Sequence, residues 1–114
     1  MTMNMNQALE NLTNNIIADY ERFQTAGGRR ERTEIQARML DEFINSLRIE
    51  EGRKYIKVIA GSSVWGFIMK EGDKKFRVGD ILKAASWASP TRNAARGNIF
   101  ENYSINWTGP NYLK

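Results

Sequence analysis

The fold is decided by residues 53–70, RKYIKVIAGSSVWGFIMK, in which two apolar stretches flank a short turn signal. Residues 53–60 alternate with the period of a β-strand, which places Ile56 and Val58 on the same face. Residues 64–70 are rich in aromatic and β-branched side chains, as strands are. Because only Gly-Ser-Ser separates the two stretches, the pattern predicts two adjacent antiparallel strands.

The rest of the C-terminal part continues this sheet. After a polar turn, residues 76–78 and 81–83 predict the third strand of a meander. Residues 99–100 and 104–108 predict one or two further strands, and the Gly-Pro pair at 109–110 is expected to end the last of them.

Upstream of the sheet, two segments carry the spacing of amphipathic helices. The apolar positions of residues 5–23 recur on one helical face. The helix is expected to end at residues 25–28, since the paired glycines there disfavour helix and allow the positive φ of a C-cap. Residues 35–47 repeat the pattern. Thr33 and the glutamine three positions later fit a capping box, and a start at 29–32 is the alternative.

Together these elements predict one α+β domain over residues 1–114. An N-terminal antiparallel helical hairpin over 1–49 is followed by a small, curved antiparallel β-sheet over 50–114, which forms the ligand-binding part. With 114 residues, 41% of them hydrophobic, the chain can build one modest core. The apolar stripes of the helices are broader than such a sheet can cover, so we expect part of them to be buried in a symmetric oligomer.

The composition excludes many catalytic classes. The chain has no cysteine and no histidine, which removes thiolate nucleophiles, imidazole ligands and the usual proton shuttle at neutral pH. It also lacks the serine-nucleophile, phosphate-loop and dinucleotide-binding motifs of common enzymes. We therefore expect a binding protein with no catalytic residue, no metal and no cofactor.

No segment has the composition of a membrane span or a secretory leader. No apolar run approaches the roughly 20 residues that a span needs. The first seven residues are polar, without the basic cluster and apolar stretch of a leader. We expect a cytoplasmic protein with no membrane partner.

Charge is divided unevenly along the chain. Residues 1–51 carry six arginines against nine acids, a net −3, whereas residues 52–114 carry eleven lysines and arginines against four acids, a net +7. An anionic partner is therefore expected at the C-terminal part, with a solvated basic surface as the alternative.

Residues 86–98 form a long segment without periodicity that contains a tryptophan and two arginines but no acid. Such a segment in a compact domain is disordered or functional, and this composition favours a ligand loop. Arginine binds phosphate oxygens bidentately, asparagine can hydrogen-bond a base edge, and an indole stacks a purine. The candidates are Trp87, Arg92, Asn93 and Arg96. The alternatives are that Trp87 packs beneath the loop and that Arg96, the expected phosphate anchor, pairs with Asp80 or Glu101.

Trp65 is a second candidate for stacking on a base. Simple alternation places it on the strand face of Phe67 and Met69. A tryptophan at such a position belongs to the core more often than to a stacking platform, and both roles stay open.

The turn between the helices is a second candidate anion site. A helix N-terminus offers free backbone N–H groups, and here three arginines lie beside it. The candidate residues are Gly27, Gly28, Arg29, Arg30 and Thr33. One copy offers few contacts, so tight binding of a cyclic oligonucleotide is expected only where several copies converge. The alternative is a solvated tip whose arginines pair with Glu31 and Glu34.

Five stretches of the C-terminal part, taken together, resemble a known phage family. They are GRKYIKVI at 52–59, SVWGFI at 63–68, KFRVGDILKAASW at 75–87, AARGNI at 94–99 and WTGP at 107–110. As a set they are similar to the first type of Thoeris anti-defence protein over most of residues 52–110. In the helical part, the arrangement of the helices is similar to that of the family, whereas the sequence is less similar.

This resemblance implies a sponge, a protein that binds the cyclic ADP-ribose isomer made by an infected host's defence sensor and withholds it uncleaved from the effector. It implies action in the cytoplasm of the host cell and a hexamer, a trimer of dimers, with nucleotide pockets between subunits. In some members, separate sites near the three-fold axes take cyclic trinucleotides. Transferred to this chain, the first pocket would draw on Trp65, Trp87, Arg92, Asn93 and Arg96. The second would draw on the helical turn, with Arg29 and Thr33 the best matched.

Two other classes of binding protein are also compatible with the sequence. A small phage single-stranded nucleic-acid-binding domain would track a backbone with its basic curved sheet and stack bases on exposed aromatic rings. A partner-binding inhibitor of a host enzyme would leave no mark in the sequence.

Overall fold

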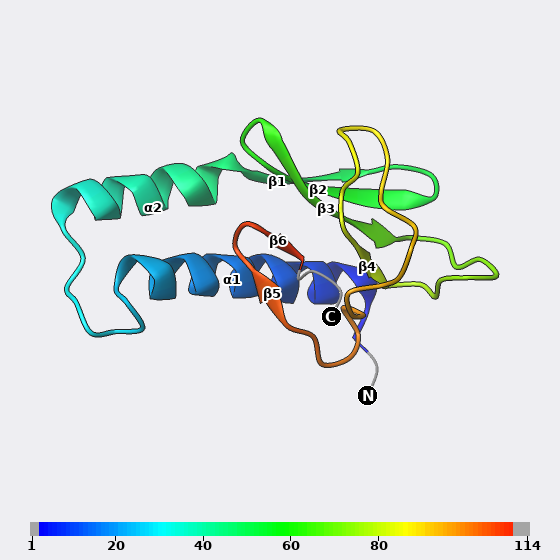
Figure 1. The fold of residues 1–114 in the computed structure, drawn as a ribbon, viewed down its shortest axis with the longest axis horizontal. Helices are drawn as coiled ribbons and strands as arrows, with labels where there is room; N and C mark the ends of the chain where they lie inside the picture. The colour runs from blue at the N-terminus through cyan, green and yellow to red at the C-terminus, as the bar shows by residue number, and fades with distance from the viewer. Residues whose placement is uncertain (1–2, 111–114) are drawn as a thin grey trace.

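The computed structural model describes residues 3–110, which form two helices and two antiparallel sheets (Figure 1). The elements are α1 (Met5–Gln24), α2 (Glu34–Ser46), β1 (Leu47–Glu51), β2 (Tyr55–Ala60), β3 (Ser63–Met69), β4 (Ile81–Leu82), β5 (Ile105–Asn106) and β6 (Gly109–Pro110). The first four strands form a sheet in the order β1-β2-β3-β4, and β5 and β6 form a separate hairpin. The predicted α+β class, a helical hairpin followed by a small antiparallel sheet, is confirmed.

Helix α1 connects the two halves of the molecule. Its first half packs against the sheet, where Leu12 and Ile16 are fully buried with Ile56 of β2 in the main core. Its second half lies beside α2, where the rings of Tyr20 and Phe43 stack at 4.3 Å between centroids (Figure 1). Burying each large apolar side chain stabilises the fold by about 1.5–3 kcal/mol, so these contacts fix both α2 and the sheet on α1.

Helix α2 begins at the predicted capping box. Thr33 Oγ1 accepts a hydrogen bond from the Gln36 backbone N–H at 3.1 Å, and Gln36 Oε1 accepts one from the Thr33 N–H at 3.0 Å. The alternative start at 29–32 is wrong. The chain reverses direction through residues 26–28, all with positive φ, as the paired glycines predict.

Strand β1 is not predicted by the sequence pattern, which assigns Leu47 to the helix and starts the sheet after Gly52. In the structure α2 passes directly into β1, whose residues Leu47 to Glu51 pair with Ala60 to Ile56 of β2. Residues 47–50 alternate between apolar and polar types, but the run is short and continues directly from the helical spacing, so the pattern alone does not identify a strand. Pairing with β2, a tertiary contact, makes it a strand.

The C-terminal strands also differ from expectation. Within the described residues, 76–78 and 99–100 are not strands, because their backbone groups bond in turns and to side-chain acceptors. Of 104–108 only Ile105–Asn106 is extended, and the next two residues form a tight turn. Gly109–Pro110 does not end the sheet but supplies β6.

A bulge in the central hairpin determines which face of the sheet each β3 side chain occupies. Residues 58–59 of β2 lie opposite 64–66 of β3, so Trp65 is an extra residue and the alternation reverses there. Trp65 therefore packs in the core against α1, whereas Phe67 and Met69 lie in a second cluster on the opposite face, here called the outer face. The expectation that Trp65 shares the face of Phe67 and Met69 is wrong for this reason.

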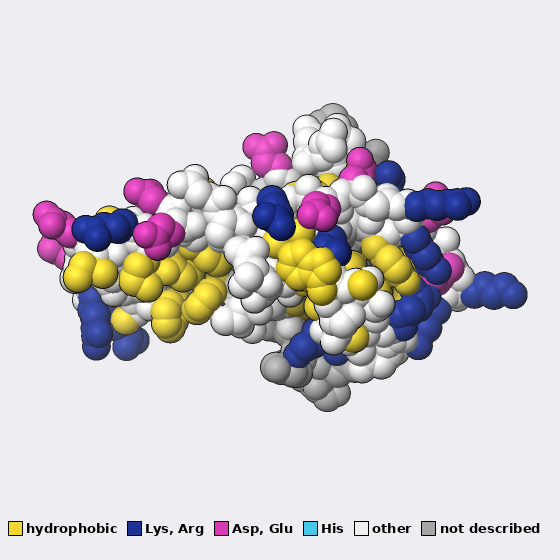
Figure 2. Space-filling model, turned by 90° about the horizontal axis from the view of Figure 1, so that it is seen from above, with side chains coloured by type: hydrophobic (Ala, Val, Ile, Leu, Met, Phe, Trp, Pro, Cys, Tyr) yellow, Lys and Arg dark blue, Asp and Glu magenta, His cyan; other side chains and the backbone are white. Residues whose placement is uncertain are grey.

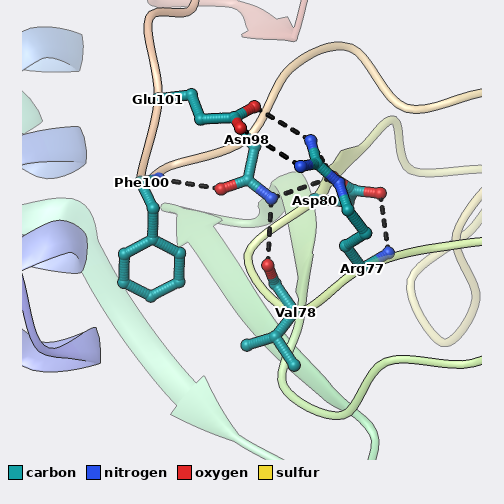
Figure 3. Close-up of polar contacts among 6 residues, drawn as sticks. All are labelled: Arg77, Val78, Asp80, Asn98, Phe100 and Glu101. Carbon is teal, nitrogen blue, oxygen red and sulfur yellow. Dashed lines mark hydrogen bonds and ion pairs between the residues drawn. The ribbon is translucent and has the colours of Figure 1, made fainter. Parts of the chain in front are cut away.

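A buried polar network fixes the chain around β4 (Figure 3). Asn98 is 4% exposed, and its side-chain amide donates to the Val78 carbonyl and to Asp80 Oδ1, both at 2.9 Å. Its Oδ1 accepts from the Phe100 N–H at 2.9 Å. Both N–H groups and the oxygen of this buried amide thus have hydrogen-bond partners. These bonds tie residues 78–80 to residues 98–100.

Candidate functional site

Residues 83–98, here called the covering segment, lie over the outer face of the sheet (Figure 1). The segment leaves β4, turns at its tip and returns beside β4, where the Thr91 N–H donates to the Lys83 carbonyl at 2.7 Å and the Arg96 N–H to the Ile81 carbonyl at 2.8 Å. Its Ala84 and Ala95 pack against the outer-face cluster. The long segment that the sequence marked as functional is therefore ordered by hydrogen bonds to β4.

A hollow of about 260 Å³ opens beside the tip of the covering segment. Three cations and two aromatic rings contribute to its lining: Arg53, Lys54, Lys57, Tyr55 and Phe67. Glu50 and Glu51 of β1 also line it. The hollow combines positive charge, flat apolar surface and hydrogen-bond acceptors, the groups that a nucleotide requires.

Trp87 lies at the tip of the covering segment and is 48% exposed. The ammonium group of Lys57 lies 4.8 Å from the centroid of its indole, a cation–π contact, and 6.0 Å from that of Phe67. Trp65 is 3% exposed, and its indole N–H donates to the Asn106 carbonyl at 2.9 Å. Of the two stacking candidates, Trp87 therefore presents accessible ring surface in this chain, and Trp65 does not.

Arg92 is bound to other residues of the chain. Its guanidinium donates to the Tyr55 hydroxyl and to Asp73 Oδ2, both at 2.6 Å, and lies 4.7 Å from the centroid of the Phe76 ring. These contacts fasten the covering segment to β2 and to the turn between β3 and β4. Asp73 compensates the charge of Arg92.

Asp73 accepts hydrogen bonds from several donors. The backbone N–H groups of Phe76 and Lys75 donate to its Oδ1 at 2.9 Å, and Arg92 and Lys54 contact its Oδ2 at 2.6 and 3.1 Å. The bonds from Phe76 and Lys75, followed by that from Arg92, hold the pKa of the Asp73 carboxyl well below its ordinary value of 3.8.

Acid is expected to weaken the contacts of the Asp73 carboxylate with Arg92 and with the backbone of its turn. Because the folded pKa of Asp73 is depressed, its contribution to stability is complete above the unfolded pKa near 3.8 and is lost as the pH falls below that value. Urea unfolding of the parent and of Asp73→Asn, measured between about pH 6 and about pH 2, should show a stability difference that shrinks with acid. A difference independent of pH would contradict the assignment.

Arg96 differs from Arg92 in having no acidic partner among residues 3–110. Its Nη1 donates to Asn93 Oδ1 at 3.0 Å and to the Ala94 carbonyl at 2.8 Å, both neutral acceptors. Its Nε is buried and has no hydrogen-bond partner. The charge of this guanidinium is therefore held in place by the loop but is not neutralised.

The carboxylates expected as alternative partners of Arg96 bind Arg77 instead. The guanidinium of Arg77 contacts both carboxylate oxygens of Glu101, at 2.9 and 3.1 Å, and lies 3.9 Å from Asp80 Oδ1 (Figure 3). The alternative pairing of Arg96 with Asp80 or Glu101 is wrong, because the turn before β4 places Arg77 nearer to both acids.

The turn between the helices offers fewer free backbone groups than expected. The N–H groups of Gly27 and Gly28 donate to the carbonyls of Arg22 and Thr25 at 2.8 and 3.0 Å, and that of Thr33 donates to Gln36. Arg32 pairs with Glu21 across the hairpin at 3.5 Å rather than with Glu31 or Glu34. Arg29 and Arg30 are exposed and form no ion pair within the described part of the chain. Their guanidinium groups remain the anion-binding candidates there.

The sequence reasoning missed the contribution of strand β2 to the site. Alternation does place Tyr55 and Lys57 opposite Ile56 and Val58, but it does not say that the covering segment lies on that side. That position follows from the packing of Ala84 and Ala95 on the outer-face cluster.

Two further properties concern residues 3–110. None of the helices within this range is both long and apolar enough to cross a membrane. The same residues contain no group of three or more acidic, histidine or cysteine side chains placed to hold a metal ion.

Comparison with known proteins gives one match. The model of a family of unknown function, DUF7717, matches residues 1–111. No curated protein and no solved structure matches the chain.

Proposed function

The chain belongs to this family of unknown function, and we propose that it binds a cyclic ADP-ribose isomer beside the covering segment and sequesters it without cleavage. Acting in the cytoplasm of an infected host, such a phage sponge would withhold a defence signal from its effector. The proposal draws on the resemblance to the first type of Thoeris anti-defence protein and on the geometry around Arg96 and Trp87.

The observation that carries the proposal is the uncompensated guanidinium of Arg96. Within the described residues the other arginine of the covering segment, Arg92, is paired with Asp73, whereas Arg96 bonds only the neutral oxygens of Asn93 and Ala94. A fixed guanidinium without an acidic partner keeps its charge and its Nη2 donors for a phosphate. Asn93, whose Oδ1 accepts from Arg96, would offer the N–H groups of its side-chain amide to the same ligand.

Stacking and further charge would come from the tip of the covering segment. Trp87 offers exposed indole surface, and Lys57, which lies over that indole, supplies a second cation for a diphosphate. A stacked base contributes about 1–3 kcal/mol and each hydrogen bond to a charged group about 1.5–3 kcal/mol. Several such contacts together approach the roughly −12 kcal/mol of a nanomolar complex.

Recovery of the ligand tests sequestration directly. The protein is mixed with the cyclic ADP-ribose isomer, freed of unbound ligand by gel filtration and denatured by heat, and the supernatant is analysed by chromatography. We expect intact ligand in an amount stoichiometric with the protein. A cleaved product would show an enzyme, and no recovered ligand would contradict the proposal.

One observation favours the runner-up, a single-stranded nucleic-acid-binding domain. Lysine and arginine side chains gather at the end of the molecule opposite the helical turn, around the ends of the sheet (Figure 2). Salt separates the two functions, because nucleic-acid affinity falls steeply with salt as counterions are released. Binding of a single diphosphate-bearing ligand should depend on salt much less.

Self-assembly is part of the proposal. Helix α2 has no buried side chain in this chain, and its Ile35 is 66% and Met39 48% exposed. Figure 2 shows hydrophobic side chains gathered over this half of the molecule. A second copy of the chain would remove this surface from water, as in a symmetric oligomer such as a hexamer built from three dimers.

Light scattering at micromolar concentration should therefore give a mass several times 13.1 kDa. Ile35→Glu with Met39→Glu should lower that mass toward the monomer, because charges in an apolar interface are costly to bury. Lys74→Glu, at the opposite end, serves as the control and should leave the mass unchanged. A stable monomer for the parent protein would contradict assembly through α2.

A second ligand site for cyclic trinucleotides is proposed at the turn between the helices. Its residues are Gly27, Gly28, Arg29, Arg30 and Thr33. Arg29 and Arg30 would supply the charge, since the hydroxyl of Thr33 already accepts the capping bond of α2. Several copies of the turn would have to converge, because one copy provides only these two exposed guanidinium groups.

A further inference from the structure

A second hollow, away from the covering segment, is lined by an unusual set of side chains. It has a volume of about 320 Å³ and lies between α1 and residues 99–103. Four asparagines contribute to its lining: Asn11, Asn14, Asn15 and Asn102. We call it the carboxamide hollow. Nothing in the proposed function uses it.

The three helical asparagines are not explained by the stability of α1. They occupy positions i, i+3 and i+4, so they share one helical face. Asparagine is a poorer helix former than the glutamate, glutamine, lysine or alanine that an exposed position would otherwise accept. Three such residues on one face lower the stability of the helix. Their presence therefore indicates another role for their carboxamides.

Most of the hydrogen-bonding capacity of these carboxamides is free. Asn15 donates to the Tyr103 hydroxyl at 2.8 Å, and Asn11 contacts only the sulfur of Met3, a weak acceptor, at 3.1 Å. The side chains of Asn14 and Asn102 form no hydrogen bond with any other residue of 3–110. The Tyr103 hydroxyl, which accepts from Asn15, keeps its own proton for donation.

The carboxamide hollow lacks a net charge that could select an ion. No lysine or arginine contributes to its lining, and its one carboxylate, Glu101, is held by Arg77 through two contacts of 2.9 and 3.1 Å. A phosphate would find no cation there, and a cation would find an acid that is already neutralised. The ligand that fits is uncharged and rich in hydrogen-bonding groups.

We propose that the carboxamide hollow binds an uncharged purine base or nucleoside, of which adenosine is the representative. A carboxamide presents a donor and an acceptor side by side, which match the N6 and N7 groups of adenine. Met3, Ile99 and the ring carbons of Tyr103 provide apolar surface for a flat ring. The volume lies within the range of small-molecule sites.

The experiment follows the side-chain amides of the intact protein. Adenosine is titrated into ¹⁵N-labelled protein, and the NH₂ signals of the four asparagines are recorded together with the indole signals of Trp87. We expect the asparagine signals to shift and saturate while those of Trp87 stay in place. Adenosine 5′-monophosphate should bind no more tightly than adenosine, and ribose alone should not bind.

A double variant separates binding from folding. Asn11→Ala with Asn14→Ala removes two carboxamides but improves the helix propensity of α1, so Tm should stay equal or rise. The same variant should lose adenosine affinity at least tenfold. Asn6→Ala, on the same helix but outside the lining, is the matched control and should bind as the parent does. Sequestration of the cyclic ADP-ribose isomer should be unchanged in both variants.

Three results would overturn the proposal. They are the absence of any shift with adenosine at millimolar concentration, shifts that persist in the double variant, and a response to ribose as strong as that to adenosine. Shifts of the Trp87 indole without the asparagine signals would also overturn it, since the nucleoside would then occupy the outer-face site. None of these outcomes depends on the proposed sequestration, because that function is read out with a different ligand.

Discussion

Arg96→Ala is expected to weaken binding of the cyclic ADP-ribose isomer at least 100-fold and to leave the stability of the fold nearly unchanged. Two hydrogen bonds from a guanidinium to phosphate, at about 1.5 kcal/mol or more each, correspond to a factor of about 100 in affinity. Arg96 holds no carboxylate and bonds only Asn93 and Ala94, its own near neighbours. Its removal therefore leaves no buried acid without a partner.

The comparison with Arg92→Ala makes this prediction specific. Arg92 binds Tyr55 and Asp73 and covers the ring of Phe76, so its loss should lower the thermal stability as well as any affinity. Calorimetry gives the affinity of each variant, and thermal unfolding followed by circular dichroism gives its Tm. An Arg96→Ala protein that is folded and binds as tightly as the parent would show that the phosphate is held elsewhere.

Gly79→Ala should destabilise the fold by about 2–5 kcal/mol. Gly79 has φ +90°, a conformation that costs a residue with a side chain about 1–2 kcal/mol. An added Cβ would lie 2.6 Å from the Phe100 ring and 2.8 Å from Asn98 Oδ1, and overpacking of this kind costs about 1–3 kcal/mol. Because Asn98 is buried and fully bonded, it cannot give way without breaking its network.

Thermal unfolding should show this change as a fall in Tm of roughly 10–20 °C. Gly27→Ala separates the two causes, since Gly27 has φ +73° but no atom within 4 Å of the added Cβ. That control should cost only the backbone term, about 1–2 kcal/mol. Equal losses at the two glycines would mean that contact with Phe100 and Asn98 contributes nothing.

Local patterns predicted the helices and the central hairpin because the information lies within a few residues. The apolar spacing of residues 5–23 fixes the buried face of α1, and Thr33 with Gln36 fixes the start of α2. The alternation of residues 53–60 likewise survives in β2, with Ile56 and Val58 in the core.

Composition predicted part of the candidate site in the same way. Residues 86–98 stand out because they contain Trp87 and two arginines but no acid, and the structure leaves Trp87 exposed and Arg96 without an acidic partner within residues 3–110. The carboxamide hollow was not predicted, because Asn102 lies far along the chain from the asparagines of α1.

The sequence by itself therefore determined the helical hairpin and the central sheet-forming segments, since each depends on near neighbours in the chain. It also marked residues 86–98 as a candidate ligand loop by their composition. Only the tertiary structure decided that β1 is a strand, that the bulge sends Trp65 into the core, and which arginine receives which acid. The edge pairing of β1 and the ion pair of Arg77 with Glu101 depend on residues distant in the chain, and the bulge depends on how β2 and β3 pair. Periodicity within one segment does not reveal such contacts, because their energy depends on which segments meet in space.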